Sequence, residues 1–205
     1  MLKIWGRANS ANVKKVLWVA EELGLAYERV DAGGAFGVVG TPEYRAMNPM
    51  GLVPVLQDGD LTLFESNTIV RYLAAKYGVG SLWIADPGAR AAAEKWMDWS
   101  HSFAHPFRDV IFGLLRTPAE QRDLAAIARG VAECARLFGI ADAELGRNPW
   151  LSGSAFGIGD VPLGPFAHVW FNLPIERPDH PRLEAWYARL LERPAYAKLV
   201  ATPLS

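Results

Sequence analysis

Glu65 and Ser66 combine an acid and a hydroxyl directly before a helix that we expect to begin near Asn67. Ser66 can cap that helix, and the free backbone N–H groups of a helix N-terminus favour an anion. The Glu65 carboxylate can hold an ammonium group. A carboxylate-binding group and an ammonium-binding group side by side suit the α-amino-acid end of a peptide-like ligand.

A predicted β-hairpin precedes this pair and positions it. Two short apolar runs, Gly51–Leu56 and Leu63–Phe64, are separated by the tight-turn signal Asp58-Gly59-Asp60. Pro54 comes just before the first of the two strands, where its missing backbone N–H does no harm. A cis peptide bond at Pro54 would form a sharp corner there.

The first 78 residues alternate between strand and helix patterns. We expect strands at Leu2–Trp5 and Tyr27–Val30, a helix after Ser10 that ends at Gly24, and a short helix at Thr41-Pro42-Glu43. After the hairpin, a further helix ends at Gly78. The order β-α-β-α-β-β-α is a thioredoxin-like layout, an α/β domain with a mixed sheet.

The rest of the chain has helical patterns throughout. Residues 79–88 are the candidate linker, and residues 89–205 form a predicted all-helical domain. The predicted helices are Ala89–Phe103 with a kink or end at His105-Pro106, a long helix from the capping box Thr117-Pro118-Ala119-Glu120 to Leu145, one from near Gly157, one over Pro181–Leu191, and a short one after Arg193-Pro194.

Composition excludes several classes of function. Hydrophobic residues make up 51% of the chain and the formal net charge is −1, which is typical of a globular protein and not of a nucleic-acid or anionic-membrane binder. No apolar run is long enough to span a membrane, and the N-terminus does not resemble a signal peptide, so we expect a cytoplasmic protein. The single cysteine, Cys134, excludes an intrachain disulfide and a Cys-based zinc site. We expect it to be buried and inert.

The pattern V-P-V-L (Val53–Leu56) followed by Glu65-Ser66 at a helix start resembles the glutathione-binding half of the glutathione S-transferase family, in particular its bacterial Ser- and Thr/Asn-type members. The resemblance covers nearly the whole chain. It implies a homodimer, glutathione as co-substrate with no permanently bound cofactor, and a small electrophile as the second substrate.

The resemblance also assigns the candidate site residues. Ser10, with Asn12 as a second donor, would stabilise the glutathione thiolate, because the turn after the first strand holds no cysteine. The alternative is that Ser10 or Asn12 only caps the helix. Val53 before cis Pro54 would pair with the cysteinyl backbone of glutathione. Ser66 would bind its γ-glutamyl carboxylate, and Glu65 its ammonium group.

Two further regions follow from the resemblance. Trp99, Phe103 and Arg108 would line the second-substrate pocket, although aromatic residues at helical spacing are more often core. Relatives hold the glycyl carboxylate with basic residues where this chain has Leu52 and Val39. Lys14, Lys15 and Arg7 are the candidate substitutes.

Three expectations complete the sequence prediction. We expect no metal site, because the pair His101 and His105 has no carboxylate or cysteine partner at ligand spacing. In the segment Phe156–Val161, the family motif has Ser or Thr where this chain has Gly157, so only the Asp160 half of the helix cap remains. Two alternatives to a transferase stay open: a glutathione-dependent disulfide reductase or peroxidase, and a non-catalytic binding protein on the same fold.

Overall fold

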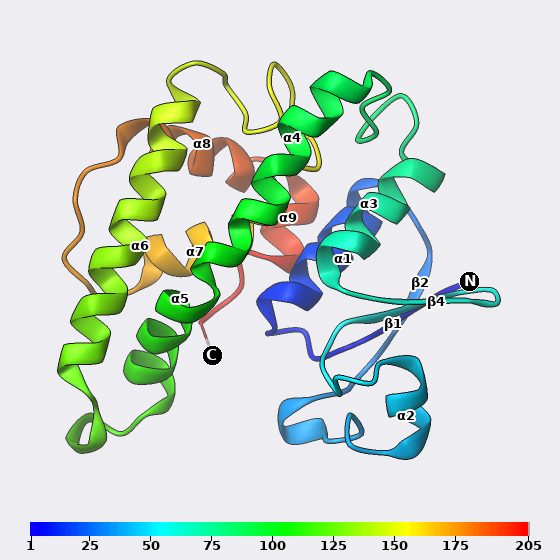
Figure 1. The fold of residues 1–205 in the computed structure, drawn as a ribbon, viewed down its shortest axis with the longest axis horizontal. Coiled ribbons are helices and arrows are strands. Elements are labelled where there is room, and N and C mark those ends of the chain that lie inside the picture. Colours follow the sequence, from blue (N-terminus) through cyan, green and yellow to red (C-terminus); the bar gives the residue numbers. More distant parts are fainter. Residues whose placement is uncertain (205) are drawn as a thin grey trace.

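The computed structural model describes residues 1–204 and has two parts (Figure 1), a mixed α/β sheet domain followed by a helical domain. Residue 205, the last of the predicted helical domain, lies outside the described residues. In the first part the elements are β1 (Leu2–Trp5), α1 (Ala11–Glu22), β2 (Tyr27–Val30), a 3₁₀ turn (Gly34–Phe36), α2 (Pro42–Met47), β3 (Val55–Asp58), β4 (Leu61–Phe64) and α3 (Ser66–Tyr77).

The four strands form one sheet in the order β2-β1-β3-β4. β1 runs parallel to β2 and antiparallel to β3, and β3 pairs with β4 across the predicted tight turn, with Val55 opposite Phe64. This confirms the thioredoxin-like layout. The predicted strand bounds at Leu2–Trp5 and Tyr27–Val30 are confirmed residue for residue. The cap of α2 is confirmed as well, because Thr41 Oγ1 accepts the Tyr44 N–H at 3.2 Å.

The helical part begins at α4, and residues 78–86 connect α3 to it. Pro87 and Gly88, assigned to the linker in the sequence prediction, lie in the first turn of α4, because Asp86 caps that helix by accepting the Ala89 N–H at 2.7 Å. The helices are α4 (Pro87–Trp99), α5 (Ala104–Ile111), α6 (Leu124–Leu145), α7 (Gly164–Asn172), α8 (Pro181–Leu191) and α9 (Pro194–Leu199). The predictions for α8 and α9 are confirmed.

Between α4 and α6 the chain changes helix type, which corrects two predictions. A 3₁₀ segment at Ser100–Phe103 joins α4 to α5, so Pro106 lies in the first turn of α5 and does not end a helix. A π-helical turn at Phe112–Arg116 follows, and the capping box at Thr117 opens only the short 3₁₀ segment Ala119–Gln121. The Thr117 hydroxyl donates to the Phe112 carbonyl at 2.8 Å, so it closes the preceding helical turn and leaves Asp123 to cap α6.

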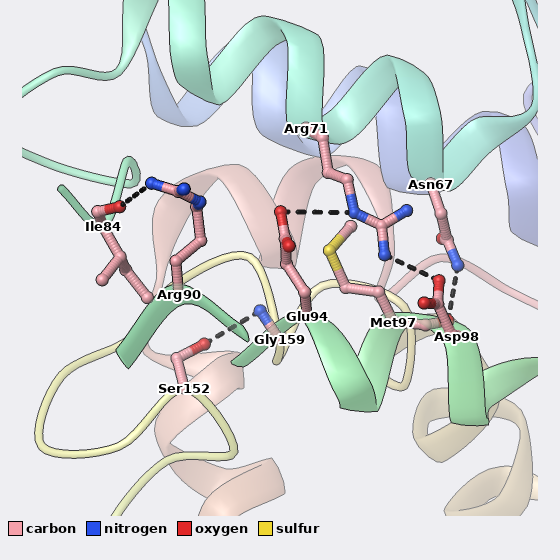
Figure 2. Close-up of polar contacts among 9 residues, drawn as sticks. All are labelled: Asn67, Arg71, Ile84, Arg90, Glu94, Met97, Asp98, Ser152 and Gly159. Atoms are coloured by element: carbon pink, nitrogen blue, oxygen red, sulfur yellow. Dashed lines mark hydrogen bonds and ion pairs between the residues drawn. The ribbon is translucent and has the colours of Figure 1, made fainter. Parts of the chain in front are cut away.

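The two parts pack against each other through α3 and α4 (Figure 2). The Arg71 guanidinium on α3 reaches Glu94 at 3.4 Å and Asp98 at 2.6 Å on α4. One turn away, Asn67 Nδ2 donates to the Met97 carbonyl at 2.6 Å, and this contact is buried. Helix α1 also packs on α7 and α9, so it contacts both parts of the molecule.

Asp160 organises the loop before α7. Its fully buried carboxylate accepts N–H groups from Leu151, Ser152 and Gly157 at 2.8–3.3 Å and the Trp186 indole N–H at 2.8 Å. The predicted bond back to residue 157 is thus confirmed. The helix itself begins later than predicted, at Gly164, because residues 158–163 form turns and Pro162 has no N–H to continue a helix.

The hydroxyl that the family motif has at position 157 comes here from a different residue. Ser152 Oγ accepts the Gly159 N–H at 2.9 Å, so the loop is capped from five residues upstream of Gly157. An added Cβ at Gly159 would lie 2.7 Å from the Ala93 carbonyl oxygen of α4, so this position requires glycine. The loop therefore docks against α4 without the usual cap residue.

Candidate functional site

Ser10 lies between β1 and α1 with its hydroxyl free of a capping role. It occupies the N-cap position of α1 with extended backbone angles, and its side chain makes no cap hydrogen bond. The residue is 8% exposed and lines a cleft between the two parts of the molecule. The predicted alternative, that Ser10 only caps the helix, is therefore not supported by its side-chain geometry.

Asn12 lies in the first turn of α1 and links it to α3. Its Oδ1 accepts a hydrogen bond from Lys15 Nζ at 2.9 Å and one from Ser66 Oγ at 3.2 Å. An ammonium group can only donate, so the atom it contacts must be the amide oxygen. The Asn12 side-chain NH₂ is consequently the part left to donate to a ligand in the cleft, which Asn12 also lines.

Lys15 is a fully buried lysine that supports this arrangement. Besides Asn12, its ammonium group lies 5.3 Å from the centre of the Phe166 ring, within cation–π range. Burial lowers the pKa of Lys15 from 10.5 to about 8, and the nearby negative charge of Glu65 counteracts part of that shift. Sequence reasoning considered Lys15 only as a carboxylate ligand. The feature that could have indicated its structural role is its place inside the run Val13–Ala20, which is buried throughout.

The start of α3 differs from the prediction. Ser66 is the first residue of the helix and Glu65 is its N-cap, so the expected Ser66 cap is wrong. The buried Ser66 hydroxyl instead donates to Asn12, which holds it at the junction of the two helix N-termini. Glu65 is exposed and has a φ of 70°, a strained value for a residue with a side chain. Such strain is typical of functional positions.

The Val53–Pro54 peptide bond is cis, as predicted. The preceding residues are held by two side chains that sequence reasoning missed, because the Leu52 carbonyl accepts both the Tyr44 hydroxyl and the buried Asn48 amide at 2.8 Å. Gly51 has a φ of 64°, and a Cβ there would lie 2.9 Å from the Val39 carbonyl oxygen. The segment before β3 is thus fixed at both ends.

The cleft that contains Ser10 has a volume of about 340 Å³. The sheet domain contributes the β1–α1 turn, and the helical domain contributes α5, the π turn, α7 and residues 203–204. Of the predicted site residues, Ser10, Asn12 and Arg108 line it directly. Ser66 is joined to it through Asn12, and Glu65 through its charge on Lys15.

Trp99 and Phe103, predicted to line the second-substrate pocket, are not among the described residues around the cleft. Phe103 is fully buried and stacks on Phe166 with ring centres 5.4 Å apart, and Trp99 packs edge-on against Phe103. Phe103 therefore belongs to the core, and Trp99 is partly buried against it. Phe107 and Phe112 supply the aromatic lining instead.

Lys14 anchors the C-terminal segment that forms one side of the cleft. Its ammonium group donates to the Val200 carbonyl at 3.0 Å and to the Thr202 hydroxyl at 2.8 Å. The His168 ring is 2.7 Å from the Thr202 carbonyl oxygen and holds the same segment from α7. Lys14 is therefore engaged within the protein, as Lys15 is through Asn12. Of the three substitutes suggested for the glycyl carboxylate, Arg7 is half-buried at the edge of the cleft.

The single cysteine lies outside this site. Cys134 is buried on α6 and burial raises its pKa to about 12, as expected for an inert thiol. Among the described residues no group of three or more His, Cys, Asp or Glu side chains could hold a metal ion. In the same part of the chain, no helix is long and apolar enough to cross a membrane.

Comparison with known proteins agrees with this geometry. The model of the glutathione S-transferase N-terminal domain matches residues 1–75, and that of the C-terminal domain matches residues 125–189. The chain is 50% identical to glutathione S-transferase GstB of Escherichia coli over the full length of both, and 33% identical to glutathione S-transferase 3 of Zea mays, covering 98% of this chain and 93% of that one.

A similar solved structure is the theta class glutathione S-transferase of Xanthomonas axonopodis pv. citri with glutathione bound. It is 54% identical to this chain, covers 100% of it and 99% of its own length, and superposes with a TM-score of 0.96. Its apo form superposes with a TM-score of 0.88 at 48% identity.

The buried Lys15 ammonium predicts a pH dependence of stability. Its pKa is lower in the folded protein than in the unfolded chain, so the folded protein binds fewer protons between about pH 8 and 10.5. Stability therefore rises with pH in that window, by up to about 3 kcal/mol. Urea unfolding at pH 7.5 and 10.5 should show this gain in the wild type and in Lys95→Met, an exposed control, but not in Lys15→Met. An equal response of all three proteins would contradict the assignment.

Proposed function

The chain belongs to the glutathione S-transferase family, and we propose that it binds glutathione across the N-termini of α1 and α3 and conjugates its sulfur to a hydrophobic electrophile in the cleft. The observation that carries the proposal is the pair of donors at the start of α1. The Ser10 hydroxyl makes no cap bond, and the Asn12 amide is oriented by Lys15 and Ser66.

The proposed mechanism is stabilisation of the glutathione thiolate. The thiolate is the nucleophile, and a free thiol near neutral pH is mostly protonated. Hydrogen bonds from Ser10 and Asn12, together with the positive end of the α1 dipole, favour the anion at this point. The thiolate then attacks the electrophilic carbon, a C–S bond forms, and the leaving group departs with its electron pair, while the thiol proton passes to solvent.

Glutathione itself would lie along the junction of α1, α3 and the segment before β3. We assign the ammonium group to Glu65 and the γ-glutamyl carboxylate to the Ser66 end of α3, because a helix N-terminus offers free N–H groups to an anion. Val53 lies outside the β1–β3 and β3–β4 ladders, which begin at Val55, so its backbone can pair with the cysteinyl amide.

The sulfur must come from the ligand. No cysteine lies at the start of α1, and Cys134 is buried on α6 with a raised pKa. A reductase that uses its own thiol is therefore disfavoured. A glutathione-dependent reductase would need the same thiolate, and the apolar lining of the cleft favours conjugation to a hydrophobic electrophile.

We also propose a homodimer. Large apolar side chains are exposed on neighbouring segments of the sheet domain, with Met50 at 65% and Leu52 at 60% before β3, and Leu61 and Phe64 on β4. Exposed apolar side chains gathered in one region are typical of interfaces between copies of a chain.

The thiolate proposal predicts how two variants behave. One hydrogen bond to an anion is worth about 1.5–3 kcal/mol, which corresponds to about one to two pKa units. Ser10→Ala should raise the pKa of bound glutathione by that amount and lower turnover, with little change in affinity. The pKa is read from the thiolate absorbance of the complex against pH. If only Asn12→Ala has this effect, the roles of the two residues are exchanged. If neither variant does, the sulfur lies elsewhere.

The anchoring proposal predicts a loss of affinity in Glu65→Gln. Removing one partner of a charge-assisted bond costs about 1.5–3 kcal/mol, or roughly ten- to a hundredfold in the dissociation constant of glutathione. Calorimetric titration measures this directly. Glu94→Gln, which removes an acid from the α3–α4 contact, is the matched control and should bind glutathione like the wild type. Unchanged affinity in Glu65→Gln would refute the assignment.

The dimer proposal predicts the mass in solution. Light scattering at micromolar concentration should give twice the chain mass of 22.5 kDa. Leu52→Glu should shift the protein toward the monomer, because it places a charge in the apolar surface. Leu124→Glu, at an exposed position on α6, should leave the mass unchanged. A monomer mass for the wild type would exclude the dimer.

A further inference from the structure

The C-terminal segment, Val200–Leu204, separates two hollows of the protein. It leaves α9 without continuing as helix or strand and runs between the two parts of the molecule (Figure 1). On one side, Pro203 and Leu204 line the cleft between those parts. On the other side, Thr202 and Pro203 line a second hollow of about 270 Å³. Pro203 therefore lies between the two hollows, and Asn9, from the β1–α1 turn, lines both as well.

The second hollow suits an apolar group. Leu17 of α1, which is buried, forms part of its lining. Two basic residues also line it, and each is paired with an acid of the same domain or its neighbour. Arg29 forms an ion pair with Asp31. Lys198 forms one with Glu21. The hollow is comparable in volume to the cleft of about 340 Å³, so joining the two would admit a much larger ligand.

Thr202 is the point at which the C-terminal segment is held. Lys14 of α1 donates to the Val200 carbonyl at 3.0 Å and to the Thr202 hydroxyl at 2.8 Å. His168 Nε2, on α7, lies 2.7 Å from the Thr202 carbonyl oxygen, which can only accept, so this nitrogen carries the hydrogen. The sheet domain thus binds the side chain of Thr202 and the helical domain binds its main chain. The next residue, Pro203, has no N–H with which to add a bond.

The His168 ring is itself fixed by its neighbours. With the hydrogen on Nε2, the neutral ring accepts at Nδ1, where the Tyr187 hydroxyl of α8 lies 3.0 Å away. Asn172 Nδ2 donates to that hydroxyl at 3.1 Å and to the His168 carbonyl at 2.8 Å. Burial lowers the pKa of His168, which favours this neutral form. The ring therefore presents a fixed donor to Thr202.

We propose that Thr202 is a positioning residue that sets the size of the electrophile. Held by Lys14 and His168, it keeps Pro203 and Leu204 in place as a wall of the cleft. When the wall is released, the second hollow joins the cleft, and longer or broader apolar electrophiles fit. The inference rests on the proposed transferase function. Thr202 acts through the segment, because it lines the second hollow and is not among the described residues around the cleft.

Two S-substituted glutathiones test the wall without catalysis. S-benzylglutathione carries one ring on the sulfur and S-(9-anthracenylmethyl)glutathione carries three fused rings, so the two substituents probe the place of the electrophile at two sizes. Without a size limit, the larger apolar substituent binds more tightly. Calorimetric titration of the wild type should instead show binding of the anthracenylmethyl compound that is weaker by about tenfold or more, because an overfilled site must deform.

Variants at the anchor should relax this limit. Thr202→Val with His168→Leu removes two of the bonds that hold the segment and changes no described residue around the cleft. It should shift the ratio of the two dissociation constants toward the larger compound by about tenfold, the worth of two ordinary hydrogen bonds. Thr202→Ser keeps the hydroxyl and should retain the wild-type ratio. So should Ser81→Ala, which removes a hydroxyl bond to a carbonyl in the connection between α3 and α4.

Circular dichroism checks that each variant is folded. If the double variant does not fold, Thr202→Val alone should still shift the ratio in the same direction, by about threefold for one lost bond.

Hydrogen exchange measured by mass spectrometry reports on the segment itself. Residues 200–204 should exchange faster in the double variant than in the wild type, Thr202→Ser or Ser81→Ala. Unchanged exchange in the folded variant would overturn the inference, because these bonds would then not hold the segment. Faster exchange with an unchanged ratio would overturn it as well, since a loosened segment would then not admit the larger ligand. Tighter binding of the anthracenylmethyl compound by the wild type would also contradict the wall.

Turnover separates this inference from the proposed function. With 1-chloro-2,4-dinitrobenzene the glutathione sulfur forms the C–S bond and chloride leaves with the electron pair of the C–Cl bond. If the wild type accelerates this reaction but does not discriminate between the two S-substituted glutathiones, the inference is overturned and the transferase function stands. If it discriminates between them but does not accelerate the reaction, the function is overturned and the wall remains.

Discussion

The amide oxygen of Asn12 is the contact on which the rest of the site depends. It accepts a hydrogen bond from the buried Lys15 ammonium and another from the Ser66 hydroxyl, so one atom joins the N-terminus of α1 to that of α3. A buried ammonium group is costly without such a partner. The same contact orients the Asn12 amide and holds Ser66 against the first turn of α1, so the N-termini of the two helices lie side by side.

This arrangement requires the two domains to keep their relative positions, because α1 packs against elements of both. Trp18 on α1 packs against Phe156 and Tyr196 of the helical domain, with ring centres 5.4 Å and 4.8 Å apart. Arg193 adds two hydrogen bonds to Glu22 at the other end of α1. These contacts of α1 and the α3–α4 contact of Figure 2 hold the two walls of the cleft in place. A site built between rigid elements controls the geometry of reacting groups better than one built on loops.

Local sequence rules predict an element correctly where nearby residues alone determine it. They fail where another group competes for the same hydrogen bond. Strands β1 and β2, the Thr41 cap and the helix Pro181–Leu191 were predicted as they stand, because turn residues and caps decide them locally. The hairpin was predicted as well, but its strands β3 and β4 have different bounds from the predicted apolar runs. The helix start predicted at the Thr117 capping box is wrong, because the Thr117 hydroxyl donates to the Phe112 carbonyl instead. Ser66 was expected to cap its own helix, but Asn12, 54 residues away, accepts from it. The basic lining of the cleft could not be predicted from the sequence either, because its arginines come together only in the fold.

The cap that Ser152 supplies makes positions 152 and 157 interdependent in evolution. A Ser introduced at position 157 would place its Cβ 3.0 Å from both the Cβ and the hydroxyl oxygen of Ser152. Removing Ser152 alone would leave the Gly159 N–H without that oxygen. We expect each single substitution to change stability, whereas exchanging both residues would again supply one hydroxyl in this loop. The two positions therefore form an epistatic pair, and related sequences should carry the hydroxyl at one position or the other.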